Sequence, residues 1–356
     1  MEFKDVLEAM IESEASDSFV RANSPLKARV YSVVKVIKEE IFSPEDVERF
    51  IKEITDENLK KSLYETGSCE FALWYRRHWR FRIGIFYQRG TPAMVIRKID
   101  LRIPSFDELN LPVAVLEKFC QQRGGIVLLT GSTGSGKSTT IASMVEYINQ
   151  NFGKHILTIE EPIEFTFTDK KGIINQREVG KDVSSYSDAL RQFALHSPDV
   201  IYIGNIRDEA TCYAALTAAE TGVLVLSTLH TVNASSSIER IINFFPPYQH
   251  QLILTQLSNL LKGVLSLRLL PRIDKPGLIP AYEVMILSPT ISRLLRENKL
   301  WEIPKYISTG EIYGMKSFNQ SLLELVENEK ISSQVALQCS DKKEDLELQL
   351  RNRELI

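Results

Sequence analysis

The residues with the clearest chemical meaning lie in one short stretch, Gly131 to Thr139. Their order, Gly-x-x-x-x-Gly-Lys-Ser, is the spacing of a phosphate-binding loop. Glycines let successive backbone N–H groups turn toward phosphate oxygens, and a helix that begins after the loop adds donors and partial positive charge. A Gly/Ser-rich turn without a ligand is the alternative, but it does not account for a strand, a Lys-Ser pair and a helix in this order. The residues predicted to bind nucleotide are Ser132, Thr133, Gly134, Ser135, Gly136, Lys137, Ser138 and Thr139.

Two side chains of this loop have distinct expected roles. The ammonium group of Lys137 is expected to reach the outer phosphates, and the hydroxyl of Ser138 is expected to ligate Mg²⁺. The sequence therefore predicts a protein that binds a nucleotide with magnesium.

Alternating strands and helices are predicted to hold this loop. Short apolar runs that look like buried parallel strands alternate with helical patterns, which is typical of an α/β fold with a parallel sheet. From Ser235 onward the chain is expected to be mostly helical, with a charged amphipathic helix in Asp341–Ile356. The predicted strands are Ile126–Thr130, His155–Glu160, Val200–Gly204 and Val223–Thr228, and the predicted helices are Ser138–Asn149, Ser187–His196 and Glu209–Glu220.

The first hundred residues have a different pattern and predict a separate α+β domain. Helices are expected at Phe3–Ser13, near Pro44–Ile54 and near Glu57–Thr66, followed by a meandering sheet. Phe81, Ile83 and Ile85 alternate with polar or small residues, so one face of their strand should be buried. The predicted strands are Cys69–Arg76, Trp79–Tyr87 and Met94–Ile99. Residues 101–116 contain two prolines and no sustained period, so they are interpreted as a linker between domains 1–100 and 117–356.

Composition excludes several classes of protein. The 356-residue chain carries a net charge of −3, which argues against a protein dominated by contacts with a nucleic-acid backbone. Its four cysteines are scattered singly, so neither a zinc site nor a disulfide framework is expected, as suits a reducing cytoplasm. No run approaches the ~20 apolar residues that a membrane-spanning helix needs. Any work at a membrane is therefore expected to go through a partner.

A series of motifs after the loop resembles the secretion ATPase superfamily, and within it the PilT/PilU motors that retract type IV pili. No four-cysteine zinc motif of the extension-type relatives is present, which favours the retraction branch. Thr290–Glu297 lies where the retraction branch has a helical motif, with Ile291, Leu294 and Leu295 on one apolar face. The motifs that carry the resemblance are Ile156–Phe165, Asn175–Val179, Ala189–Arg191, Pro198–Asp208, Ala215–Gly222 and Ser227–Thr231.

The resemblance implies a PAS-like domain at 1–100, a linker at 101–116 and a RecA-like ATPase domain at 117–356 with a helical C-terminal part. It also implies that ATP binds with Mg²⁺ between the domains of a hexameric ring, to which neighbours contribute arginines. The ring would be a homo-hexamer or a mixed ring with a paralogous ATPase. It would lie in the cytoplasm and act on an inner-membrane pilus platform protein, with no nucleic acid as partner.

The resemblance also assigns catalytic roles. Glu164 matches the family's catalytic glutamate, which orients and polarises the attacking water. The alternative for Glu164 is a solvated acidic turn beside Pro162. His230 matches the second histidine of the family's histidine box and is expected to sense nucleotide, whereas an isolated histidine here would be a packed or capping residue. Arg207 is similar to a family arginine near the site, and an ion pair with Asp208 or Glu220 is its alternative role.

One position departs from the family in a way that bears on catalysis. Asn205 stands where the family has a glutamate beside the nucleotide, and it is counted with the catalytic residues. An amide can hold a water but cannot take a proton, and losing such a charge typically costs ~10²–10³ in rate. Leu195 and Val223 also depart from the pattern, because the family has arginine and histidine there. Glu164 alone doing the work, with Asn205 tolerated, is the alternative.

Arginines of the first domain are candidates for contacts with a neighbour's nucleotide. Arg82 and Arg97 lie on predicted strands, and guanidinium groups can stabilise charge on a γ-phosphate. A solvated sheet face is the alternative for both. Taken together, the sequence predicts a retraction motor with weak hydrolysis. The alternatives are an accessory ring subunit that binds ATP and depends on an active paralogue, and a DotB-like secretion ATPase.

Overall fold

The chain forms two compact units, Met1–Arg102 and Ile103–Ile356, each with its own hydrophobic core. They are seen here in a computed structural model, which describes residues 1–30, 33–76, 79–99, 102–192 and 196–356. The predicted linker, 101–116, overlaps the start of the second unit. Within it, the carbonyl of Pro104 accepts a hydrogen bond of 2.8 Å from Ser143 Oγ, and helix α4 begins at Val113.

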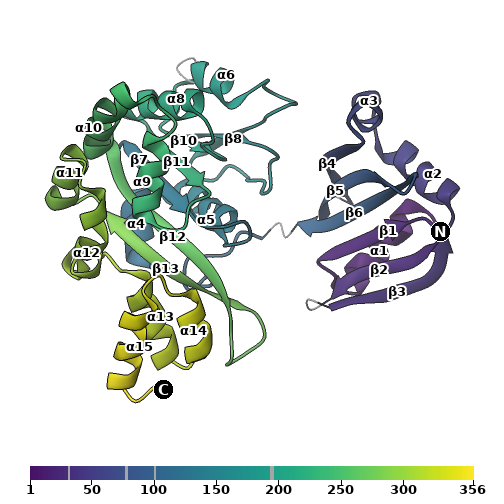
Figure 1. The fold of residues 1–356 in the computed structure, drawn as a ribbon. Coiled ribbons are helices and arrows are strands. Elements are labelled where there is room, and N and C mark those ends of the chain that lie inside the picture. The colour runs from purple at the N-terminus through teal and green to yellow at the C-terminus, as the bar shows by residue number, and fades with distance from the viewer. Residues whose placement is uncertain (31–32, 77–78, 100–101, 193–195) are drawn as a thin grey trace. The chain divides into compact units, whose positions relative to one another are not determined.

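The first unit is a six-stranded antiparallel sheet with three helices, in the strand order β3-β2-β1-β6-β5-β4 (Figure 1). The alternation predicted around Phe81, Ile83 and Ile85 is confirmed, because all three side chains are buried on the same face of β5. Phe50 of α2 packs its ring against those of Phe3 and Phe42 on this core. The elements are α1 (Phe3–Glu12), β1 (Asp17–Arg21), β2 (Ser24–Val30), β3 (Val33–Phe42), α2 (Pro44–Ile54), α3 (Glu57–Thr66), β4 (Ser68–Tyr75), β5 (Trp79–Gln88) and β6 (Thr91–Ile99).

The second unit is built on a seven-stranded sheet in the order β13-β12-β7-β11-β10-β8-β9. Every neighbouring pair is parallel except β12 with β13, which is antiparallel. The strands are β7 (Gly125–Thr130), β8 (His155–Glu160), β9 (Ile173–Glu178), β10 (Val200–Ile203), β11 (Leu224–Leu229), β12 (Leu261–Pro271) and β13 (Leu278–Ile286).

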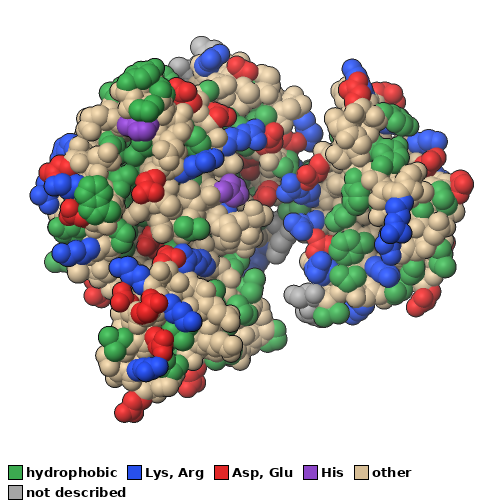
Figure 2. Space-filling model, viewed as in Figure 1, with side chains coloured by type: hydrophobic (Ala, Val, Ile, Leu, Met, Phe, Trp, Pro, Cys, Tyr) green, Lys and Arg blue, Asp and Glu red, His purple; other side chains and the backbone are tan. Residues whose placement is uncertain are grey.

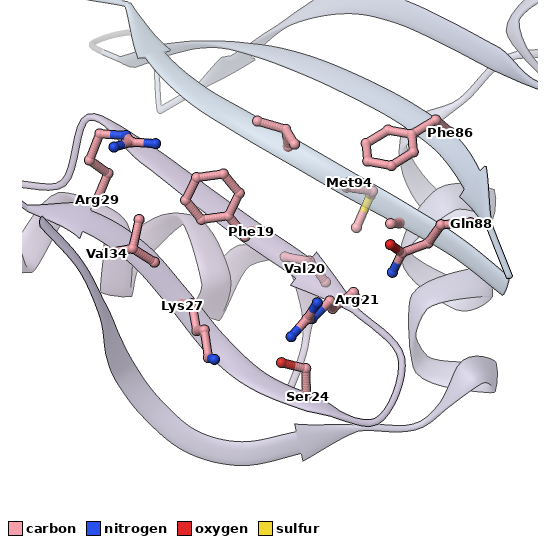
Figure 3. A pocket seen from close by; sticks show the side chains of 12 residues that line it. Phe19, Val20, Arg21, Ser24, Lys27, Arg29, Val34, Phe86, Gln88 and Met94 are labelled. Carbon is pink, nitrogen blue, oxygen red and sulfur yellow. The ribbon is translucent and has the colours of Figure 1, made fainter. Parts of the chain in front are cut away.

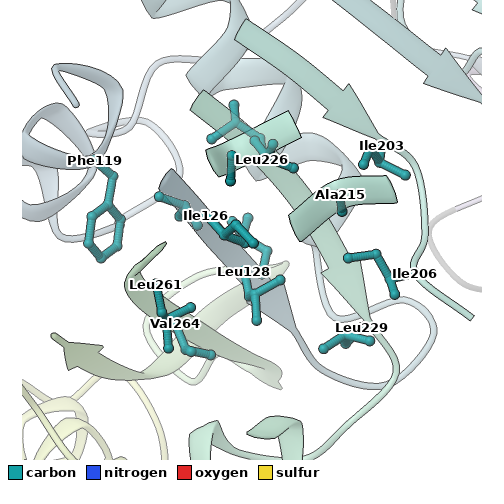
Figure 4. Packing of buried hydrophobic residues seen from close by; sticks show 14 of the residues in the cluster. Phe119, Ile126, Leu128, Ile203, Ile206, Ala215, Leu226, Leu229, Leu261 and Val264 are labelled. Atoms are coloured by element: carbon teal, nitrogen blue, oxygen red, sulfur yellow. The ribbon is translucent and has the colours of Figure 1, made fainter. Parts of the chain in front are cut away.

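Helices cover both faces of this sheet, since β7, β10 and β11 are buried along their whole length. Apolar side chains of β7, β11 and β12, among them Ile126, Leu226 and Val264, pack into one continuous core (Figure 4). The described helices are α4 (Val113–Cys120), α5 (Lys137–Asn151), α6 (Tyr186–Arg191), α8 (Glu209–Glu220), α9 (Ala234–Ile242), α10 (His250–Leu260), α11 (Pro289–Arg296), α12 (Ile303–Ser308), α13 (Phe318–Glu327), α14 (Ser333–Cys339) and α15 (Lys343–Asn352).

The expectation of a mostly helical chain after Ser235 is wrong for two strands, β12 and β13. Strand β12 is rich in leucine, a good helix former, and it is buried on both faces, so its sequence shows no alternation. Its place beside β7 overrides that local preference. Strands β2, β3 and β9 were not predicted. Helix α6 agrees with the expected helix Ser187–His196 as far as Arg191, and residues 193–195 lie outside the described residues.

The last three helices form a small bundle of their own, which we call the C-terminal bundle (α13, α14 and α15). Leu346 and Leu350 of α15 are buried, and they pack with residues of α13 and with Leu270 and Ile279 of the β12–β13 hairpin. The predicted amphipathic helix of the tail is thus confirmed as α15. No helix among the described residues is both long and apolar enough to cross a membrane.

Candidate nucleotide-binding site

The predicted phosphate-binding loop joins the end of β7 to the start of α5. Gly131, Gly134 and Gly136 all have positive φ, at 146°, 78° and 94°. A Cβ on Gly131 would stand 2.4 Å from Ser135 Oγ and 2.6 Å from the carbonyl oxygen of Leu267, so only glycine fits. These backbone turns are the ones a loop needs if its N–H groups are to face an anion.

Lys137 folds back across this loop. Its side chain is 7% exposed, and Nζ donates hydrogen bonds to the carbonyl oxygens of Gly131 at 2.9 Å and Ser132 at 2.8 Å. Burial lowers the pKa of Lys137, while the carboxylate of Glu164 raises it. Burial also lowers the pKa of His230, and the charge of Lys137 lowers it further. The structure therefore brings Glu164, Lys137 and His230 within electrostatic reach of one another.

Three strand ends supply the residues around the loop. Glu164 follows β8, Asn205 follows β10 and His230 follows β11, and these strands run parallel to β7 or to its neighbours. Their carboxyl ends consequently share one edge of the sheet with the loop, where ligands bind in open α/β sheets.

The acidic box, Glu160 to Glu164, begins with another residue whose pKa is shifted. The Glu160 side chain is 5% exposed, and burial raises its pKa to about 7, although the hydroxyl of Thr158 and the amide of Gln176 both donate to Oε1. The charge of Glu164 raises this pKa further. Near neutral pH, Glu160 can therefore exchange a proton beside Glu164.

Arg207 is held by the same acidic box. Its guanidinium forms an ion pair with Glu161 at 2.7 Å and lies 5.4 Å from the centre of the Tyr186 ring. The alternative ion pair with Asp208 or Glu220 is wrong in this structure. Asp208 caps α8 through the backbone N–H of Thr211, and Glu220 accepts from Gln256.

Asn205, two residues after the end of β10, has an acceptor without a partner among the described residues. Its Oδ1 is buried and has no hydrogen-bond partner among the described residues. The backbone around it is fixed, because Thr228 Oγ1 donates to the carbonyl of Gly204 at 2.6 Å and the N–H of Ile206 donates to the carbonyl of Thr228 at 3.1 Å. Ser135 Oγ of the loop is buried and unpartnered in the same sense. Buried acceptors of this kind normally have a partner, so both point to a ligand or water.

The candidate arginines lie in the other unit, where each has a local partner. Arg82 pairs with Glu70 across the β4–β5 ladder, and Arg97 Nε donates to Asp17 at 2.8 Å. Arg80, on the same strand as Arg82, is buried, and its guanidinium lies 5.6 Å from the Trp74 ring centre. Val223 is buried just before β11, and Leu195 lies outside the described residues.

A separate hollow of about 440 Å³ lies on the first unit, on the sheet face opposite the buried side chains of β5. Phe19 and Val34 contribute apolar surface to it, and Arg21, Lys27 and Arg29 supply positive charge (Figure 3). It contains none of the predicted site residues. On the face shown in Figure 2, side chains of both signs are interspersed.

Comparison with known proteins gives the family. The model of the family described as Type II/IV secretion system protein matches residues 4–345. This chain belongs to that family. The type IV pilus ATPase PilU of Pseudomonas aeruginosa is 36% identical over 351 residues, 99% of this chain and 92% of PilU. PilT, the type IV pilus retraction ATPase of the same organism, is 36% identical over 336 residues, 94% of this chain and 97% of PilT.

Two solved structures share the fold of this chain. The crystal structure of the pilus retraction motor PilT with bound ADP matches with a TM-score of 0.91 and 41% identity, over 98% of this chain and 99% of that one. The Legionella pneumophila ATPase DotB matches with a TM-score of 0.80 at 24% identity, over 94% of each chain, and so shares the fold. The predicted resemblance, fold class and P-loop ATPase are confirmed.

Some residues around the loop and the acidic box could not be identified from the sequence. Gln176 lies in the motif Asn175–Val179, but nothing in the spacing of that motif predicts its hydrogen bond to Glu160. Thr130 Oγ1 donates to Ser266 Oγ at 2.8 Å, which ties the strand before the loop to β12. No signal in the sequence pointed to Ser266, because the segment that carries it was expected to be mostly helical.

Proposed function

We propose that this chain is an ATP-hydrolysing motor subunit of a type IV pilus retraction machine. The observation that carries the proposal is the full-length similarity to PilU and PilT, joined to a complete phosphate-binding loop. The 41% identity to the PilT motor and the 24% identity to DotB favour retraction over a DotB-like secretion role.

The loop residues fit ATP and magnesium. Gly131 holds the positive φ that such a loop needs, and the buried Oγ of Ser135 has no hydrogen-bond partner among the described residues, so it is open to a phosphate oxygen. Ser132 to Thr139 would hold the phosphates, and Ser138, whose side chain is half-buried at the start of α5, would hold Mg²⁺. The metal would supply charge neutralisation at the β- and γ-phosphate oxygens.

Each remaining site residue then has a chemical task. Lys137 gives positive charge in a buried position, where it acts more strongly than in water. Glu164 orients a water and accepts its proton, and its own charge is balanced by Lys137. His230, which lies in the electrostatic field of Lys137, senses whether nucleotide is bound and transmits this to the chain that follows β11. Arg207 holds the acidic box in place through Glu161.

Weak hydrolysis follows from Asn205. Its Oδ1 can orient a water but adds no negative charge, so the site has one carboxylate fewer than the family pattern. The second candidate function, an accessory ring subunit that binds ATP and relies on an active paralogue, is favoured by this same residue.

The proposed assembly is a six-membered ring, either of this chain alone or mixed with a paralogous ATPase. Arg82 and Arg97 would approach a neighbour's nucleotide after leaving Glu70 and Asp17, their present partners. Hydrolysis would be coupled to rotation between domains, and the ring would act on an inner-membrane platform protein from the cytoplasm, touching the membrane only through such partners.

A motility assay tests the proposal. A strain of the source organism that lacks this gene is complemented with the wild type or with Lys137→Ala, and both proteins are quantified by immunoblot. The wild type should restore pilus retraction and twitching, and Lys137→Ala should not, because loss of the loop lysine removes productive nucleotide binding. Equal restoration by both proteins would contradict the motor function.

A further inference from the structure

Strand β12 supports the phosphate-binding loop directly. Ser266 accepts the hydrogen bond from Thr130, the residue before the loop. The carbonyl of Leu267 touches the place where Gly131 has no side chain, and Leu269 lies 3.7 Å from the Cβ position of Gly136. A shift of β12 along this segment would therefore displace both glycines that shape the loop.

Arg268, in the middle of this segment, joins β12 to the C-terminal bundle. Its guanidinium carbon lies 3.8 Å from the centre of the Phe318 ring at the start of α13. The same group donates to the carbonyl of Cys339 at the end of α14, and to Asp341 Oδ1 at 2.7 Å. The Arg268 side chain is 18% exposed and that of Asp341 is 41% exposed, so this ion pair is partly accessible to water.

Arg268 also reaches the chain that follows His230. Its Nη2 donates to the carbonyl of Val232 at 3.3 Å, two residues after the histidine. Next to it, the N–H of Ala234 at the start of α9 donates to Glu283 Oε1 at 2.8 Å. Glu283 is 7% exposed and feels the charge of Arg268. The turn between β11 and α9 is thus held from β12 and β13 together.

One guanidinium consequently connects three parts of the molecule: the loop-supporting strand, the turn after His230 and the C-terminal bundle. A largely enclosed charge that serves several acceptors is costly to leave half-satisfied. Separation of the bundle from β12 would break the bonds to Cys339 and Asp341 and leave this guanidinium with fewer acceptors.

We propose that Arg268 is a positioning residue that couples docking of the C-terminal bundle to nucleotide binding at the phosphate-binding loop. This coupling rests on the proposed nucleotide-binding function. Because coupling between two sites is reciprocal, nucleotide must tighten the bundle by the same factor by which the docked bundle tightens nucleotide binding. The C-terminal bundle is then a regulatory input that can adjust the motor's affinity for ATP.

The chain carries its own reporter for this coupling. Cys339 is half-buried and its carbonyl accepts from Arg268, whereas Cys69, Cys120 and Cys212 are buried. The rate of maleimide labelling at Cys339, located by mass spectrometry, measures how often the bundle undocks. Labelling is followed for the full-length protein with and without saturating ADP, and ADP affinity is measured by calorimetry.

In the wild type, ADP should slow labelling of Cys339 at least ~5-fold, the lower end of typical coupling. Arg268→Leu keeps an apolar contact with Phe318 but removes the hydrogen bonds. It should label quickly with or without ADP and bind ADP at least ~5-fold more weakly. The matched control is Arg351→Leu, which breaks an exposed arginine–acid pair with Glu347 inside α15 and should behave as the wild type.

One further variant and two possible results for the wild type complete the test. Asp341→Asn, an exposed and milder change, should move both quantities in the same direction as Arg268→Leu and carries the test if that variant does not fold. If the wild type binds ADP but Cys339 labels at the same rate with and without it, the coupling is refuted while the nucleotide-binding function stands. If the wild type binds no ADP, the proposed function fails and the coupling with it.

Discussion

At the scale of single residues, Glu160 has the environment that departs furthest from water among the carboxylates of the site. Its pKa is raised to about 7, so the folded protein holds a proton that the unfolded chain, near the ordinary value of 4.5, has lost. The stabilising contribution of this proton is complete below about pH 4.5 and disappears as the pH rises to about 7. The charge of Glu164 opposes ionisation of this carboxyl group, whereas hydrogen bonds from Thr158, Gln176 and the backbone of Glu164 favour it.

A variant that is neutral at every pH tests this assignment. Glu160→Gln should remove that loss of stability between pH 5 and pH 8, so its melting temperature should rise relative to the wild type as the pH increases. Glu161→Gln, which neutralises an exposed carboxylate in the same turn, should leave the wild-type slope in place. Parallel slopes for Glu160→Gln and the wild type would show that Glu160 does not titrate in this window.

The site residues that sequence could assign were those in contiguous motifs. The spacing of glycine, lysine and serine in Gly131 to Thr139 is recognisable in the sequence itself. Glu164 and His230 follow predicted strands, so the edge of the sheet on which they lie could be inferred. Ser266, Arg268 and Glu283 could not, because their roles depend on strand pairs between distant segments. A period in the sequence shows which face a residue takes, but not which strand becomes its neighbour.

At the scale of elements, the turn from β7 into α5 depends on glycine for two separate reasons. Gly131 has a φ of 146°, and a side chain there would also meet Ser135 Oγ and the Leu267 carbonyl. Gly131→Ala should lower the free energy of unfolding by about 2 kcal/mol or more, and it should weaken ADP binding. Denaturant titration and calorimetry measure the two effects.

The neighbouring glycine provides the matched control. Gly134 also has positive φ, at 78°, but its Cβ would meet nothing within 4 Å. Gly134→Ala should therefore show the backbone cost alone, about 1 kcal/mol. If the two variants lose equal stability, β12 does not press on the loop as described.

Local preference and tertiary position disagree most clearly in β12. Its leucine-rich sequence predicts helix, yet it pairs with β7 on one side and β13 on the other. The strands between 126 and 229 were easier to predict from the sequence, because turn residues and helices mark their ends. Gly263 fits the same close packing, since a Cβ there would stand 2.3 Å from the Phe119 ring. Such an approach has no signature in the sequence beyond the glycine itself.

At the scale of the whole molecule, each unit has its own core, and each contains some of the residues proposed to contact nucleotide. The loop, Glu164, Asn205 and His230 come from Ile103–Ile356, whereas Arg82 and Arg97 come from Met1–Arg102. Complete charge stabilisation at the nucleotide is therefore proposed to need an assembled ring. A rate of ATP hydrolysis per subunit that rises with protein concentration is the behaviour expected of such an assembly.

The central claim is that this chain binds ATP with a complete loop but hydrolyses it weakly because Asn205 replaces a carboxylate. Steady-state ATPase of the wild type and Asn205→Glu, assayed side by side at concentrations where both are assembled, tests it most directly. Lys137→Ala sets the background. The restored carboxylate should raise the turnover of the wild type by ~10²–10³, with a similar KM. Robust wild-type turnover that Asn205→Glu leaves unchanged or lowers would contradict the claim.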